Sequence, residues 1–311
     1  MHLSTRESTT HEGAVTATTA PVTAPPERQR PPRALWRDAL GRLLHHRSAM
    51  VGLGIVVTLT LIAIFAPLLI PFDPIRINPL EARYSPGWPY IFGTDQYGRD
   101  VFSRVIMGTR ISLIIGLVVV GIASVVGVAV GLISGFYGGW IDTILMRIID
   151  VMLAFPNILL ALVIVSILGP NLTNLMIAVG ISAIPTYARL ARASVLSARE
   201  ELYVEAAQVI GTPQSQIIVR HILPNVIAPL IVTATLGTGT AILAAAALSF
   251  LGLGSQPPTP EWGRMLSEGR QYLRDQWWIA TFPGLAIMVT VLAMNLLGDG
   301  LRDALDPRLK R

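Results

Sequence analysis

Three charged residues stand in a strongly apolar part of this sequence and are the first candidates for chemistry. Asp142, Arg147 and Asp150 lie between uncharged stretches, in sequence that favours a helix. Arg147 and Asp150 are three residues apart, so they can pair on one helix face. Ionisable groups in apolar surroundings are expensive unless they are paired or face a cavity. We therefore favour ion pairs, either here or across to Arg302 or Asp303, over the alternative of a proton relay.

Two more polar residues fall in the last apolar stretch. Asn295 and Asp299 are one helical turn apart. A gate at the end of this helix, or a packing contact, fits them better than an ion site. With Asp150 they form the set of candidate pore or gate residues.

Residue counts exclude several other kinds of chemistry. The sequence has no cysteine, which rules out disulfides, cysteine-ligated metals and iron–sulfur clusters. Its only lysine is Lys310 and it has no Gly-x-x-x-x-Gly-Lys, so it has no ordinary P-loop, and any ATP hydrolysis must come from partners. His45 and His46 are adjacent on a predicted helix and so point in different directions, which favours an interfacial position over metal binding. We expect no catalytic residue, no metal and no cofactor bound by this chain.

The elements that carry these residues are long apolar segments. Hydrophobic residues make up 52% of the chain and charged residues 14%, which is too apolar for an ordinary soluble domain. A helix of about 20 residues crosses roughly 30 Å of hydrocarbon. The uncharged runs of at least that length are Ala49–Phe72, Ile111–Ile141, Val151–Ala188, Ile222–Pro260 and Gln276–Gly298. The third run is long enough for two spans, with a predicted hairpin tip at Gly169–Asn174. The sequence therefore predicts an all-α integral membrane protein with six transmembrane helices.

Basic residues predict the orientation of these spans. The pI near 10.0 reflects retention of arginine on the cytoplasmic side rather than binding to nucleic acid. The arginines before the first span are Arg28, Arg30, Arg33, Arg37, Arg42 and Arg47. They place the N-terminus inside, and six spans then place the loop at 189–225 and the C-terminus inside as well. Arg99, Arg104 and Arg110, at the end of a predicted outer loop, argue mildly against this orientation.

The chain divides into three parts by composition. Residues 1–33 are rich in Thr, Ala and Pro and predict a disordered cytoplasmic tail. Residues 34–48 alternate Leu and Trp with Arg at helical spacing and predict an amphipathic helix on the inner membrane surface. Residues 49–311 form the transmembrane domain, with a polar loop at 200–225.

This polar loop contains clear signals for helix ends. Residues 203–210 favour a helix, and Gly211 can take the left-handed position that ends it. Thr212 is the predicted N-cap of a second helix and Pro213 its first residue. Pro224 is predicted to close that helix.

The same residues resemble a known motif. The loop is similar to the "EAA" loop of ABC importer permeases, which has Glu-Ala-Ala, three residues, Gly and then an Ile-x-Leu-Pro ending. In this chain His221 occupies the position of the Ile. The resemblance implies that the loop docks a separate ATPase, and the coupling residues are Glu205, Ala206, Ala207, Gly211, Thr212, Pro213, His221, Leu223 and Pro224.

A second block resembles the outer-loop signature of the dipeptide/oligopeptide branch of these permeases, in the C-type subunit. Its residues are Gly93, Thr94, Asp95, Gly98, Arg99 and Asp100, followed by Ser103 and Arg104. We expect Thr94 or Asp95 to cap a helix here, and Arg99 and Arg104 to anchor it at the membrane interface. Near the pore mouth, Glu261–Arg274 has the composition of a short helix facing a binding protein.

The resemblance covers nearly all of the chain from Arg33 to Arg311. It implies the type I permease fold of ABC importers, with cytoplasmic coupling helices, in the multi-pass inner (plasma) membrane of a bacterium or archaeon. It also implies four partners, which are a homologous second permease, two ATPase subunits that carry ATP and Mg, and an extracytoplasmic substrate-binding protein. We also expect the chain to contact membrane lipid and to bind no nucleic acid. The expected function is import of dipeptides or oligopeptides; alternatives are nickel, glutathione or oligosaccharides, and an ion-driven secondary transporter.

Overall fold

The structure is a computed structural model that describes residues 41, 43 and 46–305. The predicted tail (1–33) lies outside the described residues, as does most of the predicted interfacial helix (34–48). The described helices are α2 (Arg47–Leu69), η1 (Pro79–Glu81), α3 (Val101–Tyr137), α4 (Gly139–Leu153), α5 (Asn157–Leu168), α6 (Leu172–Arg199), α7 (Leu202–Val209), α8 (Gln214–Gln216), η2 (Ile217–Ile222), α9 (Leu223–Phe250), α10 (Trp262–Gly269), η3 (Arg270–Tyr272) and α11 (Trp278–Leu305). Apart from one isolated bridge between Thr94 and Asp100, regular structure in these residues is helical.

Five of these segments are long and apolar enough to cross a membrane. In the described residues they are α2, α3, α6, α11 and the continuous segment Gln214–Phe250. Large apolar side chains stay exposed along them, for example Ile64, Leu117 and Val125 at 60%, 67% and 72%. Surfaces of this kind are stable against lipid or a partner helix rather than water. The predicted all-α membrane fold is confirmed.

The third predicted span differs from the prediction. Residues from Val151 onward do not form one straight helix, because α4 and α5 meet at an angle of 90°. The break falls just before Pro156, where the proline ring disfavours helical backbone in the preceding residue. α5 alone has 12 residues, about 18 Å of helix, which is too short to span. The described residues therefore contain six candidate spans when the bent pair is taken as one.

The turn after α5 follows the prediction. α5 ends at Leu168, Gly169 has a φ of +93°, and α6 begins at Leu172. The side chain of Asn171 caps α6 by accepting a hydrogen bond of 2.8 Å from the backbone N–H of Asn174. This is the predicted hairpin tip.

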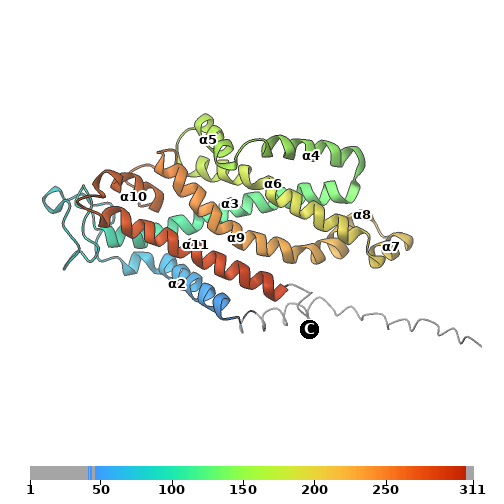
Figure 1. The fold of residues 1–311 in the computed structure, drawn as a ribbon, viewed down its shortest axis with the longest axis horizontal. Coiled ribbons are helices and arrows are strands. Elements are labelled where there is room, and N and C mark those ends of the chain that lie inside the picture. Colours follow the sequence, from blue (N-terminus) through green and yellow to red (C-terminus); the bar gives the residue numbers. More distant parts are fainter. Residues whose placement is uncertain (1–40, 42, 44–45, 306–311) are drawn as a thin grey trace, which may run out of the picture. The chain divides into compact units, whose positions relative to one another are not determined.

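A ridge of glycines brings α3 and α6 into direct main-chain contact. The two helices run side by side in Figure 1, and α3 also packs against α2 and α9. Gly127, Gly131 and Gly135 are spaced four residues apart on one face of α3. A β-carbon at Gly131 would lie 2.5 Å from the carbonyl oxygen of Ala188, so only glycine fits there. Small residues permit this close approach between membrane helices.

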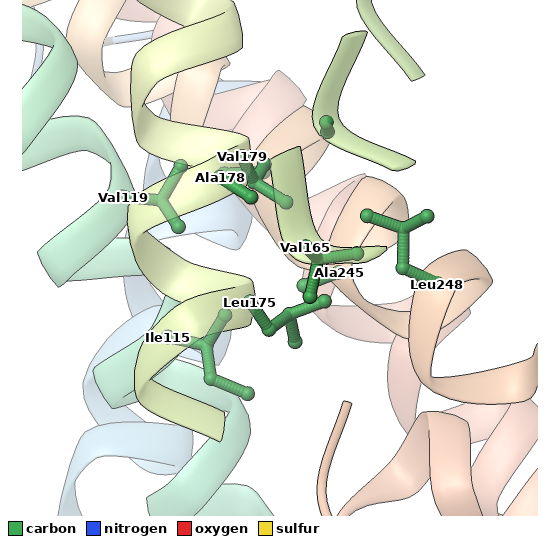
Figure 2. Close-up of a cluster of buried hydrophobic side chains, with 10 residues drawn as sticks. Ile115, Val119, Val165, Leu175, Ala178, Val179, Ala245 and Leu248 are labelled. Carbon is green, nitrogen blue, oxygen red and sulfur yellow. The ribbon is translucent and has the colours of Figure 1, made fainter. Parts of the chain in front are cut away.

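Apolar side chains from four helices close the interior beside this contact. Figure 2 shows Ile115 and Val119 of α3 facing Leu175, Ala178 and Val179 of α6. Val165 of α5, with Ala245 and Leu248 of α9, completes the cluster. The short α5 is thus held by packing although it is too short to span.

The glycine ridge leads to a stability prediction. Gly131→Ala should destabilise the protein by about 1–3 kcal/mol, the usual cost of forcing extra atoms into a packed contact. Gly121→Ala is the matched control on the same helix, because a β-carbon there meets no atom within 4 Å. Thermal unfolding in detergent should show a lower midpoint for Gly131→Ala and an unchanged or higher one for Gly121→Ala. Equal midpoints would contradict the close approach of α3 and α6.

Candidate functional site

The polar loop ends α7 with a left-handed glycine, as predicted. Gly211 has a φ of +78°. Its N–H bonds to the carbonyl of Gln208 at 3.0 Å, and the N–H of Thr212 bonds to the carbonyl of Ala207 at 3.0 Å. These two bonds form a Schellman motif, which pairs carbonyls that the helix end would otherwise leave free. The turn is therefore determined by local chemistry.

The second arm of the loop differs from the prediction. Pro213, not Thr212, is the N-cap of α8, and it offers no side-chain cap. Pro224 does not close the helix, since residues 214–250 continue as one segment. The reason is η2, a turn of π-helix directly before Pro224. Its wider hydrogen-bond spacing accommodates a proline that has no N–H to donate.

One face of the loop is packed against the ends of α3 and α6. Val204 and Ala207 of α7 are buried in a cluster with Phe136, Val195 and Ile222. Arg199 adds a hydrogen bond of 2.9 Å to the carbonyl of Phe136. His221 and Leu223 are half-buried at the side of this cluster. The loop is therefore fixed to the two helices that form the centre of the fold.

The other face carries exposed apolar residues and one carboxylate. Leu202, Val209 and Ile210 are 80%, 83% and 82% exposed. Glu205 and Ala206 are also exposed, and within the described residues the Glu205 carboxylate has no hydrogen bond or ion pair. Three large apolar side chains exposed beside an unpaired carboxylate are typical of a surface that a protein partner covers.

The carboxylates of α4 are paired with α6. Asp142 accepts two bonds of 2.6 Å from Arg192, and Asp150 accepts one of 2.6 Å from Arg189. Ion pairing was expected, but the predicted partners were wrong. Arg147 does not pair with Asp150, and the Asp303 carboxylate instead lies 3.3 Å from Nε2 of His46. Because α4 folds back along α6, arginines that are distant in sequence lie closer than those on its own helix.

A second polar site lies in the loop before α3 (residues 93–100, the signature loop) and in α10. Figure 1 shows α10 at the end of the described fold opposite α7. Gly93 and Gly98 have φ values of +72° and +74°. A β-carbon at Gly98 would lie 1.8 Å from the carbonyl of Asn78, so this loop folds tightly on itself. Thr94 supports it by accepting a bond of 2.8 Å from the N–H of Tyr84. The loop presents its charged residues inward.

At the centre of this site is a buried ion cluster. Arg99 donates to Asp95 at 2.5 Å and to Glu268 at 2.8 Å. Arg104 lies 3.6 Å from Asp95 and 3.5 Å from Glu268. Both arginine residues are about 2% exposed or less. The expectation that they anchor the helix at the membrane interface is therefore wrong, because each side chain points into the protein and meets carboxylates there.

The predicted helix cap in this loop was also wrong. Asp100, rather than Thr94 or Asp95, caps α3, accepting bonds from the backbone N–H of Ser103 at 2.8 Å and from its hydroxyl at 2.6 Å. Burial raises the pKa of the Asp100 carboxyl, and the bonds from Ser103 offset part of that rise. Asp95 is instead committed to the ion cluster.

Sequence reasoning missed the acidic residues of α10. Glu268 joins the ion cluster and also pairs with Arg264 at 3.2 Å. Glu261 caps α10 by accepting 2.8 Å bonds from the N–H groups of Gly263 and Arg264, and its burial raises the pKa of its carboxyl. The four-residue spacing of Arg264 and Glu268 was an available signal for a helical pair, but nothing local marked Arg99 as a further partner.

The candidate gate residues are not brought together. Asn295 lines an apolar cavity of about 590 Å³ between α9, α10 and α11. Asp299 lies one turn further along α11 and is exposed, whereas Asp150 is paired with α6. No three His, Asp, Glu or Cys side chains in the described part of the chain lie close enough to hold a metal ion.

Five candidate spans and a bent helix pair in the described residues, together with an exposed polar loop, are the architecture of an integral membrane protein. Comparison with known families agrees. Residues 127–311 match the family described as binding-protein-dependent transport system inner membrane component, and residues 34–86 match the N-terminal transmembrane domain of oligopeptide transport permease C. The chain belongs to the family of binding-protein-dependent transport system inner membrane components. It is a pore component of a transport system in the inner membrane and not an enzyme.

Curated relatives cover nearly the whole chain. The dipeptide transport system permease protein of Alkalihalophilus pseudofirmus is 50% identical over 94% of this chain and 96% of its own length. That of Haemophilus influenzae is 47% identical over 86% of this chain and 92% of its own length. The glutathione transport system permease protein of Pectobacterium atrosepticum is 45% identical over 93% of this chain and 96% of its own length.

The ion cluster leads to a second stability prediction. Glu268→Gln removes a charge that balances Arg99 and Arg104 and should cost about 3–5 kcal/mol, the usual effect of breaking a buried pair. Asp275→Asn is the matched control, because Asp275 is exposed in the segment between α10 and α11. The midpoint of thermal unfolding in detergent should fall for Glu268→Gln only. A Glu268→Gln protein that melts with the wild type would show that the cluster is not energetically significant.

Proposed function

We propose that this chain is the C-type transmembrane subunit of an ATP-driven importer of dipeptides or oligopeptides. The support for the substrate class is the match of residues 34–86 to oligopeptide transport permease C and the dipeptide permeases among the relatives at 46–50% identity. The chain would work with a homologous second permease, two ATPase subunits and an extracytoplasmic binding protein. ATP and Mg would be bound by the ATPases.

The observation that carries this proposal is the exposed face of α7. Its apolar side chains and the free Glu205 carboxylate offer a neighbouring ATPase both buried area and a charge-assisted contact. Ala206 and Gly211 are exposed beside these residues, and a β-carbon at Gly211 would meet no atom within 4 Å. The loop therefore leaves this face open to a partner.

The structure supports alternating access through two rigid connections to this loop. Its first arm is packed on the ends of α3 and α6. Its second arm continues as one helical segment from Gln214 to Phe250, which contacts α10 and α11 at its far end. When the ATPases close on ATP, a pull on α7 would move both connections together and reorient this subunit against the second permease.

Variants of the loop test the proposal in a reconstituted complex. Gly211→Val should abolish coupled uptake, because a β-branched residue strongly disfavours the left-handed backbone. Glu205→Arg should weaken ATPase attachment by replacing attraction with repulsion. Gly211→Asn is the matched control and should keep most of the activity, since Asn tolerates this conformation.

The measurements are bound ATPase per permease, ATP hydrolysis and uptake of labelled di- and tripeptides, with glutathione as a comparison substrate. We expect peptide uptake that requires the binding protein and is lost in Gly211→Val and Glu205→Arg. If both variants transported at the wild-type rate with full ATPase occupancy, the proposed coupling role of the loop would be wrong. Uptake of glutathione but of no other peptide would overturn the substrate class.

We further propose that both termini and the α7 loop are cytoplasmic, in line with the excess of arginine before the first span. The chain has no cysteine, so Ser85→Cys and Ser215→Cys can be labelled singly with a membrane-impermeant thiol reagent in intact cells. Both serines are exposed, whereas Ser267 is half-buried and bonded to the carbonyl of Phe250. Only Ser85→Cys should react from outside. Reaction of Ser215→Cys alone would invert the topology.

A further inference from the structure

One face of α4 carries exposed polar residues. Thr143, Arg147 and Asp150 follow one another at helical spacing, so they share one face of this helix, and all three are exposed. Arg189 of α6 joins this face through its bond of 2.6 Å to Asp150. Thr186, also exposed, lies one turn before Arg189 on α6. We call these five residues the polar stripe.

The polar stripe lies at the level of the spanning helices. α4 begins directly after α3 ends and packs beside α3 and α6 (Figure 1). Ile149, which lies between Arg147 and Asp150 in sequence, is buried in a cluster with Ile184 and Ala188 of α6. Ile184 is near the middle of α6, a candidate span of 28 residues. The polar stripe is therefore inside the apolar layer that these helices cross.

Lipid is a poor environment for these charges. The side chains of Asp150 and Arg189 stay 50% and 56% exposed although they are paired. Within the described residues, the Arg147 guanidinium has no hydrogen bond or ion pair. Charged groups in membrane spans almost always face a bundle interior or a water-filled cavity. A long arginine can reach the membrane surface, but the short side chain of Asp150 cannot. The polar stripe therefore requires water beside it.

A different face of α4 is suited to lipid or to a packed helix. Its large apolar side chains are between 51% and 74% exposed, and they recur at spacings of three and four residues. They are Trp140, Ile144, Ile148, Val151 and Phe155, and we call them the apolar stripe. The two stripes lie side by side on the same helix. α4 thus separates an apolar surface from a polar one, as expected of a helix at the edge of a water-filled path.

We propose that the polar stripe is part of the wall of the path that the substrate crosses, and that Arg147 binds the terminal carboxylate of a transported peptide. Asp150 already bonds Arg189, so the charge in excess on the stripe is the unpaired guanidinium of Arg147. A guanidinium binds a carboxylate through two parallel hydrogen bonds. Every peptide with a free C-terminus offers this group whatever its side chains, so one arginine can serve many sequences. The proposal rests on the proposed function.

The first test asks whether water reaches the polar stripe in the complete complex in lipid nanodiscs. The chain has no cysteine, so Thr186→Cys on the polar stripe and Ile144→Cys on the apolar stripe can be labelled singly. We expect a small charged thiol reagent to modify Thr186→Cys, with or without a non-hydrolysable ATP analogue, and to leave Ile144→Cys unmodified. Reaction of Thr186→Cys only with a lipid-soluble reagent would show that the stripe faces lipid. No reaction with either reagent would show that the second permease covers it, and either result would overturn the proposal.

The second test measures dipeptide uptake per ATP hydrolysed by the complex in proteoliposomes. This ratio should fall about tenfold in Arg147→Gln, the usual scale for losing a charge-assisted hydrogen bond. Arg147→Lys keeps the charge and should keep most of the uptake. The Kd of the binding protein and the ATP hydrolysis it stimulates should be unchanged. Arg110→Gln is the matched control, because Arg110 is exposed on α3 and lies outside the polar stripe.

The outcomes separate this site from the function it rests on. If the wild type imports peptides and Arg147→Gln imports them with the same ratio of uptake to hydrolysis, the role of Arg147 is wrong and the proposed function stands. An equal loss for a peptide and for its C-terminal amide would show that Arg147 does not bind the carboxylate, and it would overturn the proposal too. A wild-type complex that imports no peptide would overturn the proposed function, whereas modification of Thr186→Cys by the charged reagent would still support the path.

Discussion

The close contact of α3 and α6 is the constraint on which the rest of this fold depends. Three glycines let the two main chains approach to a distance at which no β-carbon fits at Gly131. Lipid tails are as apolar as the helix surfaces, so the hydrophobic effect gives membrane helices little reason to associate. Close packing therefore contributes much of the association energy. α3 starts at the buried ion cluster and ends in the apolar cluster under α7. The contact with α6 therefore connects the end that carries the ion cluster with the end that carries α7.

Charge in this protein is organised by pairing across elements that are distant in sequence. The carboxylates of α4 meet Arg189 and Arg192 of α6. Glu268 of α10 meets Arg99 of the loop before α3 and Arg104 of α3. Buried ion pairs rarely add much net stability, because desolvation offsets their attraction. What they supply is a single arrangement, since removal of either partner leaves an uncompensated charge. The buried cluster of Glu268 thus defines where α10 lies, whereas the half-exposed pair of Asp150 and Arg189 contributes little.

The features that sequence predicted are those governed by neighbouring residues. The spans follow from apolar length, the hairpin tip from Gly169 and Asn171, and the end of α7 from Gly211. The errors arise where a partner lies far along the chain. Arg99 looks like an interfacial anchor until Glu268, 169 residues later, is placed beside it. Pro156 was itself a local signal for the bend, but the prediction followed the length of the apolar run and placed one continuous span there.

Pro224 shows why a local rule can fail and still be informative. A proline inside a helix removes a donor and crowds the preceding turn, which makes a helix end the natural prediction. In this chain one π turn widens the helix just before the proline, and the segment continues to Phe250. Had the helix ended there, the loop would be joined to α9 by a break in the backbone hydrogen bonding. The π turn instead keeps the helical segment continuous from Gln214 to Phe250, up to the helices that border the apolar cavity.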